Sequence, residues 1–264
     1  MNLQLEGKRA LVSGSSAGIG FSIAKSLAHE GASVIVNGRS AVRTKVAAKM
    51  ITDSGATAKV YPFVGDLATA SGVEQLAAEI PEVDILVNNL GIYEPKPFQK
   101  ITDEEWLRFF ETNVMSGIRL SRQYLPGMKE RNWGRIVFIS SESGINIPAE
   151  MIHYGLTKTA QLALSRGLAE TTAGTGVTVN AVLPGPTRSE GVNDFVNKIA
   201  HERGTSPAAV EEEFFKTVRP SSLLKRFATT DEVAALVTFV CSPLSSATNG
   251  AALRVDGGVV RSIV

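Results

Sequence analysis

Residues 9–20 read RALVSGSSAGIG, a short apolar run followed directly by a turn with three glycines. The apolar run at 9–13 is typical of a strand buried on both faces. A helical pattern follows from 19 to 29, so the glycines lie on a strand-to-helix turn. Glycine lets backbone N–H groups approach a pyrophosphate there, and the start of the helix favours its negative charges. Any tight turn is rich in glycine, so it is the position between strand and helix that indicates a dinucleotide site.

Short β-rich runs alternate with longer helical patterns along the rest of the chain. The runs lie at 33–37, 59–64, 85–88, 135–140, 177–182 and 252–255. One helical pattern between them extends from 106 to 125. Strands that alternate with crossover helices form a parallel sheet covered on both faces. No linker divides the alternation, so we expect 1–264 to form a single α/β domain, a Rossmann-like doubly wound fold with a seven-stranded parallel sheet flanked by helices.

The composition excludes several classes of protein. Of 264 residues, 44% are apolar and 20% are charged, an ordinary globular balance. Lys and Arg number 27 against 26 acids, so no basic field predicts binding of nucleic acid. No apolar run approaches the ~18 residues of a membrane span, and the polar start does not resemble a signal peptide. With one cysteine and three histidines there are few metal ligands, so we expect a cytoplasmic protein without a metal and with Cys241 in the core.

A second informative segment is HYGLTKTAQLALSRGLAE, residues 153–170. Its apolar residues recur at helical spacing and predict one buried face: Leu156, Ala160, Ala163, Leu164, Gly167 and Leu168. Tyr154 and Lys158 stand one turn apart, so the phenol and the ammonium point into the same space. A surface tyrosine beside a solvated lysine would have the same spacing, so the pair alone does not decide between catalysis and a solvated surface.

Taken in order, the motifs of residues 5–258 resemble those of the classical short-chain dehydrogenase/reductase family, in particular its 3-oxoacyl-ACP reductase-like members. The matching stretches are SGSSAGIG at 13–20, GDL at 65–67, NNLG at 88–91, ETNVMSG at 111–117, FISSESG at 138–144, YGLTK at 154–158, LPGPTRSEG at 183–191 and VDGG at 255–258. Each motif alone is common, whereas all of them in this order are specific. The resemblance implies an NAD(P)-dependent oxidoreductase that interconverts a carbonyl and a secondary alcohol by hydride transfer.

The resemblance also implies a catalytic tetrad of Asn113, Ser141, Tyr154 and Lys158. A free tyrosine has a pKa of about 10, too high for a base near neutrality, and a nearby ammonium lowers it. Tyr154 is therefore the expected general acid/base, while Lys158 supplies the positive field and bonds the nicotinamide ribose. The family pattern assigns Ser141, rather than Ser140, to hold and polarise the substrate oxygen. It assigns Asn113 to position a water that links Lys158 to solvent.

Cofactor contacts are implied along most of the chain. The positions that match are Gly14, Ser16, Gly18, Ile19, Gly20, Arg39, Asp66, Leu67, Asn89, Gly91, Tyr154, Lys158, Pro184, Gly185 and Thr187. In the family pattern, Asp66 holds the adenine and the loop at 184–187 lies beside the nicotinamide.

The end of the second strand predicts NADP(H) as the preferred cofactor, with NAD(H) possible. NAD-selective members place an aspartate there to bond both ribose hydroxyls, and Gly38 occupies that place here. Arg39 follows and can fork onto the 2′-phosphate, while Asn37 and Ser40 can add neutral bonds. The alternative is that Arg39 is a solvated loop residue.

Substrate choice is expected to lie in a mobile lid at about 189–224, next to the active site. Thr205 or Ser206 as cap, followed by Pro207, predicts a second helix start within this segment. The charged run EEEFFK, which begins at Glu211, predicts a solvated helix face.

Four residues are candidates for the substrate pocket: Glu94, Glu142, Ser143 and His153. A solvated carboxylate is the alternative for both glutamates. His153 adjoins Tyr154, but adjacent helical residues point about 100° apart, so we expect a pocket wall or helix cap rather than a general base. Reduction of a 3-oxoacyl thioester is one expectation for the reaction, and a sugar or polyol dehydrogenase is its rival. A catalytically silent cofactor-sensing protein of the same fold is a third hypothesis.

The resemblance further implies a homotetramer, assembled through the helix that begins at Tyr154 and the helix at 106–125. Small residues would permit close approach of helices across a symmetric contact: Ala160, Ala163, Gly167 and Ala169. Packing of the helix onto its own sheet would use the same residues, so both interpretations stay open.

Overall fold

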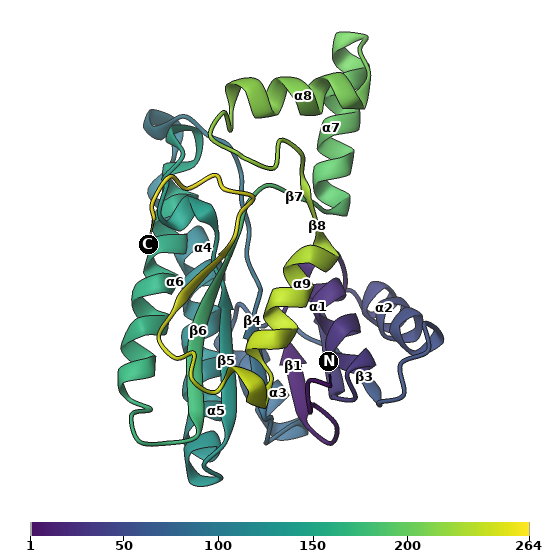
Figure 1. The fold of residues 1–264 in the computed structure, drawn as a ribbon, viewed down its shortest axis with the longest axis vertical. Helices are drawn as coiled ribbons and strands as arrows, with labels where there is room; N and C mark the ends of the chain where they lie inside the picture. Colours follow the sequence, from purple (N-terminus) through teal and green to yellow (C-terminus); the bar gives the residue numbers. More distant parts are fainter. Residues whose placement is uncertain (1, 264) are drawn as a thin grey trace.

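The computed structural model describes residues 2–263 of the chain. Seven parallel strands form the central sheet in the order β3–β2–β1–β4–β5–β6–β9 (Figure 1). The strands are β1 (Arg9–Val12), β2 (Ser33–Gly38), β3 (Val60–Val64), β4 (Ile85–Asn88), β5 (Gly134–Ile139), β6 (Val177–Pro184) and β9 (Ala252–Val255). The strand order reverses between β1 and β4, and ligands bind at such a switch point in α/β sheets. The predicted doubly wound fold with seven parallel strands is confirmed.

Helices cover both faces of the sheet. On one face lie α1 (Gly18–His29), α2 (Ala41–Asp53) and α9 (Thr230–Val240), and on the other lie α3 (Ala70–Glu79), α5 (Ser116–Glu130) and α6 (Ile152–Glu170). Successive residues of a strand enter opposite cores: Ala10 and Val12 pack with α1 and α9, and Leu11 packs in the other core. Burial on both faces explains why the strand sequences are almost continuously apolar.

The structure allows three comparisons with the expectations from composition: the burial of the cysteine, the apolar length of the helices and the grouping of metal-ligand side chains. Cys241 is buried in the core beneath α1 and α9, as predicted. No helix within residues 2–263 is both long and apolar enough to cross a membrane. The same residues contain no group of three His, Cys, Asp or Glu side chains placed to hold a metal ion.

The helix predicted at 106–125 extends over 103–130 in the structure and contains a π-helical turn. α4 (Asp103–Phe110) begins at a capping box formed with Thr102. The π turn (Glu111–Met115) follows and leads directly into α5. Single π turns inside helices are frequent at functional sites. This one contains Asn113, whose side chain is fully buried.

α6 turns a different face to the core from the one that the apolar pattern predicts. The residues that it buries are mostly polar: His153, Thr157, Lys158, Gln161 and Ser165. The predicted apolar face is open only in part: Leu156 is 47% exposed and a methyl group at Gly167 would meet no atom within 4 Å, whereas Leu164 and Leu168 pack partly buried against the core. Thr157 and Gln161 find hydrogen-bond partners on the π turn and on the backbone of α6 itself. This orientation turns Lys158 into the protein.

Two helices stand apart from the seven-stranded sheet, at the top of Figure 1. They are α7 (Glu190–Arg203) and α8 (Pro207–Thr217). A small parallel pair of strands, β7 (Thr187–Arg188) and β8 (Ala228–Thr229), connects this helix pair to the sheet. The lid predicted at 189–224 therefore consists of two helices that follow β7.

A separate apolar cluster holds α7 and α8 together. Its buried members are Val196, Ala200, Val210, Phe215 and Phe227. Ser206, rather than Thr205, caps α8 by accepting from a backbone N–H of its first turn. The prediction of a solvated charged run is wrong for Glu211, which accepts from the Phe227 N–H at 2.9 Å and pairs with Arg188. Glu211 thus ties α8 to both small strands.

Candidate active site

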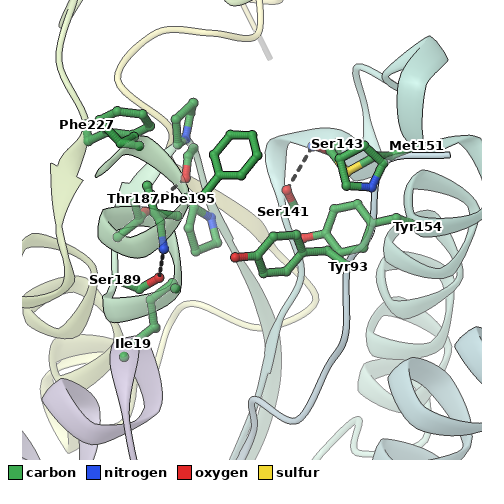
Figure 2. Close-up of a pocket in the computed structure, with 18 of the residues that line it drawn as sticks. Ile19, Tyr93, Ser141, Ser143, Met151, Tyr154, Thr187, Ser189, Phe195 and Phe227 are labelled. Atoms are coloured by element: carbon green, nitrogen blue, oxygen red, sulfur yellow. Dashed lines mark hydrogen bonds between the residues drawn. The ribbon is translucent and has the colours of Figure 1, made fainter. Parts of the chain in front are cut away.

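A cavity of about 1010 Å³ opens next to the switch point between β1 and β4. Its walls come from the glycine turn after β1, the loop after β4, the end of β5, the start of α6, the loop after β6, and the pair α7–α8. Figure 2 shows Ser141, Tyr154 and Tyr93 on one side, with Thr187 and Phe195 across from them. Concave sites at the carboxyl ends of parallel strands are where α/β folds bind ligands.

The glycine turn after β1 has no room for side chains. Gly14 and Gly18 have φ values of +62° and +59°, which favour glycine. A Cβ at Gly20 would stand 2.5 Å from Asn89 Nδ2 and 2.6 Å from the Gly14 carbonyl oxygen. Asn89 Nδ2 donates to the carbonyl oxygens of Ser13 and Gly14 at 3.0 Å each, and so clamps the turn to the loop after β4. The backbone of this turn has no side chains at its glycines and is fixed by hydrogen bonds, as close approach of a pyrophosphate requires.

The start of α1 fits the phosphates of a dinucleotide. Ala17 provides no side-chain cap, and the first turn of α1 has no acidic residue. By contrast, a serine or threonine caps each of α2, α3, α4, α7, α8 and α9. Uncapped N–H groups at a helix start carry a partial positive charge that suits phosphate oxygens. Ala17, Gly18, Ile19 and Gly20 all line the cavity, so these N–H groups face a ligand-sized space.

The end of β2 has no space for an acidic side chain. A Cβ at Gly38 would stand 2.5 Å from Thr44 Oγ1 and 2.9 Å from Ser16 Oγ. The aspartate that NAD-selective relatives place here would therefore collide with its neighbours. Arg39 follows directly and is exposed.

Asn37 and Ser40 act within the fold. Asn37 is 2% exposed, and its Oδ1 accepts from the Gly14 N–H at 3.0 Å. Its Nδ2 donates to the carbonyl oxygens of Phe63 and Gly65. Ser40 caps α2. The prediction that Asn37 bonds the 2′-phosphate is therefore wrong, because its side chain positions the glycine turn instead.

The remaining predicted cofactor positions follow other strands at the same edge of the sheet. Four of them line the cavity: Gly91, Pro184, Gly185 and Thr187. Asp66 and Leu67 follow β3, outside the cavity. Asp66 Oδ1 accepts from the Ala68 N–H at 3.0 Å, and the Leu67 side chain is buried in the core beside α3 and α5.

The four predicted catalytic residues meet on one side of the cavity. Tyr154 and Lys158 come from the first turns of α6, and Asn113 comes from the π turn behind them. Lys158 Nζ lies 5.6 Å from the centre of the Tyr154 ring. The Ser141 hydroxyl lies near the Tyr154 phenol and acts to lower its pKa. Ser140 Oγ instead donates to the Lys158 carbonyl oxygen at 2.8 Å, so Ser141 is the serine available to a substrate.

Gln161 is a site residue that the sequence analysis missed. Lys158 Nζ donates to the Ile139 carbonyl oxygen at 2.8 Å and to Gln161 Oε1 at 3.3 Å. Gln161 Nε2 donates to the main-chain oxygen of Asn113 at 2.6 Å. A buried amide thus links Lys158 to Asn113, the two residues between which the resemblance implies a water. Its spacing was a usable signal, because residues three apart on a helix share a face.

Tyr93 lines the cavity, and no motif in the sequence indicates it. The Asn113 side chain accepts from the Ile92 N–H at 2.7 Å and donates to the Ile92 carbonyl oxygen at 3.0 Å. These two bonds fix the loop after β4. The ring of Tyr93 then stands edge-on to Tyr154, with centroids 6.3 Å apart (Figure 2).

Burial dominates the ionisation of Tyr154 and Lys158. It raises the pKa of Tyr154 to about 12, although the Ser141 hydroxyl acts in the opposite direction. It lowers the pKa of Lys158 to about 7. The prediction that the ammonium brings the phenol below its ordinary pKa is therefore wrong for this structure, since burial outweighs it. A phenol with a raised pKa keeps its proton near neutrality, which suits Tyr154 to proton donation.

Glu142 and Ser143 are buried directly after Ser141, and both line the cavity. Glu142 Oε1 accepts from Arg219 Nε at 2.9 Å. Arg219 Nη1 also donates to Glu150 Oε1 at 3.1 Å. Arg219 follows α8 in the chain, so this ion pair joins the helix pair to the loop after β5. No local pattern in the sequence indicates Arg219, which lies 77 residues from its partner.

Glu94 and His153 lie outside the cavity, and the prediction of pocket positions is wrong for both. Glu94 is exposed and pairs with Arg108 at 3.2 Å. His153 is buried between α4 and α6, with its ring centre 4.0 Å from that of Phe109 and 5.8 Å from that of Trp106. One helical step from Tyr154 turns a side chain by about 100°, which directs His153 into the contact with α4.

Known proteins resemble this chain along its whole length. A family model described as short chain dehydrogenase matches residues 8–200. YvaG of Bacillus subtilis, named as an uncharacterized oxidoreductase, is 51% identical over 263 residues and covers 100% of both chains. The 3-oxoacyl-[acyl-carrier-protein] reductase FabG of Aquifex aeolicus is 32% identical and covers 98% of this chain and 100% of its own. The crystal structure of L-sorbose reductase from Gluconobacter frateurii, complexed with NADPH and L-sorbose, has a TM-score of 0.93, 29% identity and full coverage of both chains.

The family match, the switch-point cavity and the bare glycine turn agree with one another. The hydroxyl groups of Ser141 and Tyr154 meet in the same cavity as that turn. The chain therefore belongs to the short-chain dehydrogenase family, as an NAD(P)-dependent oxidoreductase that interconverts carbonyl compounds and alcohols.

Proposed function

We propose that the protein is an NADP(H)-preferring carbonyl reductase in which Tyr154 donates the proton. The observation that carries this proposal is the pairing of the Ser141 and Tyr154 side chains in the wall of a cavity whose other parts include the glycine turn. A substrate oxygen placed against both hydroxyl groups would be polarised and protonated at one position. The raised pKa of Tyr154 supports the reducing direction, because the phenol holds its proton near neutrality.

Three residues of the tetrad then have defined parts in the reduction. Ser141 holds the carbonyl oxygen, and Tyr154 transfers its phenolic proton to it. Bound NADPH supplies the hydride that the carbonyl carbon accepts. Lys158 bonds the nicotinamide ribose and stabilises the phenolate that proton transfer leaves behind. The Ile139 carbonyl oxygen and Gln161 hold the ammonium in place.

The preference for NADP(H) rests on two arginines beside Gly38. Arg39 is exposed at the end of β2, where no carboxylate repels a phosphate. Arg43 lies in the first turn of α2, lines the cavity and is 3.3 Å from Glu190 of α7. Guanidinium groups near a helix start favour a phosphate. A charge-assisted hydrogen bond contributes about 1.5–3 kcal/mol, so we expect about a tenfold to hundredfold preference over NAD(H).

Steady-state kinetics with both cofactors test the preference. We expect kcat/KM to be higher with NADPH in the wild type, and Arg39→Ala to lower the ratio of NADPH to NADH efficiency by about tenfold or more. Arg122→Ala, at an exposed position on α5, is the matched control and should keep the wild-type ratio. Equal efficiency with NADH in the wild type would overturn the assignment, and an unchanged ratio in Arg39→Ala would remove Arg39 from it.

A substrate panel tests the reductase proposal itself. Simple ketones, 3-oxoacyl thioesters and ketoses can each be followed by the loss of NADPH absorbance. The two substrate classes of the named relatives, 3-oxoacyl thioesters and L-sorbose, are the first to compare. Complete silence across the panel, with NADPH still bound in a fluorescence titration, would favour the hypothesis of a cofactor-sensing protein.

We also propose that the chain assembles as a homotetramer through the open face of α6 and the neighbouring α4. The small and apolar residues of this face include Leu156, Ala163 and Gly167, and α4 adds the exposed Leu107 and Phe110. Apolar stripes left open on adjacent helices are typical of an interface between subunits. Light scattering at micromolar concentration should give four times the mass of one chain, and a monomer mass would contradict the proposal.

A further inference from the structure

Glu142 leaves one carboxylate oxygen without a partner in the cavity wall. The residue is 3% exposed, lines the cavity and directly follows Ser141. Oε1 accepts from Arg219, whereas Oε2 is buried and has no hydrogen-bond partner. A buried carboxylate oxygen without a donor is unfavourable, and native structures keep few of them. The site therefore presents an acceptor for a donor that does not come from the chain.

Arg219 holds this oxygen in place. Its Nε donates to Glu142, and its Nη1 donates to Glu150 and to the Val218 carbonyl oxygen at 3.1 and 3.0 Å. The side chain of Arg219 is only 10% exposed, so the geometry of the group is defined by the protein. Two carboxyl groups face this one guanidinium, so the site holds more acidic than basic groups. Such a site disfavours a substrate carboxylate and suits a neutral hydrogen-bond donor.

The donor must lie beside the reacting carbonyl group. Glu142 is adjacent in sequence to Ser141, and its charge acts on the Tyr154 phenol. Much of the cavity wall across from Tyr154 is apolar, with Phe195, Phe214 and Phe227 among its residues. Glu142 lines the same cavity as Ser141 and Tyr154, so a ligand held by these two hydroxyl groups lies beside the Glu142 segment.

We propose that Glu142 Oε2 accepts a hydrogen bond from a substrate hydroxyl group on a carbon beside the reacting carbonyl. The substrates are then α-hydroxy ketones, the chemistry shared by ketoses, and the products are the corresponding diols or polyols. A 3-oxoacyl thioester has only acceptor groups near its ketone, so it would leave Oε2 unpaired and bring oxygen lone pairs against it. This inference rests on the proposed reductase function and specifies its substrate class.

Three ketones of similar size test the proposal with NADPH: hydroxyacetone, methoxyacetone and 2-butanone. The first can donate a hydrogen bond from the neighbouring position, the second can only accept one, and the third can do neither. In the wild type, we expect kcat/KM for hydroxyacetone to exceed both others by about tenfold to a hundredfold. Equal values for all three would overturn the inference, and this comparison requires no variant.

Glu142→Gln changes the kind of group that faces the substrate. Arg219 Nε would still bind the side-chain oxygen, so an NH2 group would replace Oε2 and offer a donor. We expect the advantage of hydroxyacetone over methoxyacetone to fall to within about threefold, since both can accept from that donor. Glu94→Gln is the matched control, because Glu94 lies outside the cavity, and it should keep the wild-type ratios.

Two results would separate failure of this inference from failure of the proposed function. Retention of the full wild-type ratios in a folded Glu142→Gln protein would overturn the role of Glu142 while leaving the reductase intact. Absence of turnover with every ketone and thioester in the wild type would overturn the proposed function and the inference with it.

Discussion

The glycine turn after β1 and the helix pair α7–α8 face the same cavity, but different forces hold each of them in place. The turn is held by backbone geometry: Gly14 and Gly18 have positive φ, Gly20 has no room for a Cβ, and Asn37 and Asn89 bond the main chain around them. The helix pair has its own apolar cluster and reaches the rest of the protein through ion pairs and the small strands β7 and β8. The first arrangement suits a ligand of constant shape, and the second suits a wall that differs between enzymes.

The largest effect is expected at Tyr154, which lies between the two regions. Tyr154→Phe removes the proton donor and keeps the ring, so kcat should fall by about a thousandfold or more while NADPH binding stays within about twofold. Steady-state assays and a fluorescence titration measure the two quantities. A variant that kept most of its kcat would show that another group supplies the proton.

A methyl group at Gly20 should distort the glycine turn and weaken cofactor binding. In Gly20→Ala, the new Cβ would overlap Asn89 Nδ2 and the Gly14 carbonyl oxygen, both of which are held by the fold. Overpacking of this kind costs about 1–3 kcal/mol, so the Kd for NADPH should rise by about fivefold to a hundredfold. Gly127→Ala on α5 is the control, because its methyl group would meet only the flexible end of the Arg131 side chain, and its Kd should equal that of the wild type. Normal NADPH affinity in Gly20→Ala would mean that the turn is less rigid than its contacts indicate.

Truncation within the helix pair should affect the substrate and spare the cofactor. Phe215 is 2% exposed in the separate cluster, in contact with Phe214 and Phe227. Phe215→Ala should therefore loosen α7 and α8, with kcat/KM for a ketone reduced about tenfold and the Kd for NADPH changed less than twofold. Equal losses in both quantities would show that the helix pair and the cofactor turn behave as one unit.

The smallest effect is expected in the pH dependence of the reduction. Burial lowers the pKa of Lys158 to about 7, and its charged form is the one that stabilises the phenolate. Below pH 7 the lysine is protonated, so kcat/KM should be flat there and should fall as the pH rises through about 7. Gln161→Leu removes an acceptor from the ammonium, which lowers its pKa further and should move the midpoint to lower pH.

An exposed glutamine provides the control for this profile. Gln123→Leu on α5 should leave the midpoint where it is in the wild type. A midpoint that did not move in Gln161→Leu, in a protein that still binds NADPH, would assign the titration to a group other than Lys158.

Local sequence patterns predicted the strands of the central sheet and the turn between the first strand and helix well. Strands expected at 85–88 and 252–255 are observed as β4 (Ile85–Asn88) and β9 (Ala252–Val255), and the seven-stranded parallel order is confirmed. These features depend on residues close together in the chain: an apolar run, a glycine turn and a helix start. The same is true of Tyr154 and Lys158, whose spacing on one helix already placed them on a shared face.

The sequence predicted the position of a side chain less well wherever its partner lies far along the chain. The periodicity of α6 defined two faces but not which of them is buried, because buried polar side chains such as Gln161 are stable only when the π turn supplies acceptors and donors. Its position next to Tyr154 predicts a pocket wall or helix cap for His153, whereas its ring packs on Phe109 of α4. The position of Asn37 at the end of the second strand predicts a phosphate contact, whereas its side chain bonds the glycine turn.

By itself, the sequence determined the α/β class, the glycine turn between the first strand and helix, and the shared helical face of Tyr154 and Lys158, since each depends on a few consecutive residues. Only the tertiary structure decided what surrounds the substrate. Glu142 and Arg219 are 77 residues apart, and nothing local in either segment indicates the other. Their pairing depends on how α8 returns to the loop after β5, so the unpartnered oxygen of Glu142 exists only once the whole chain has packed.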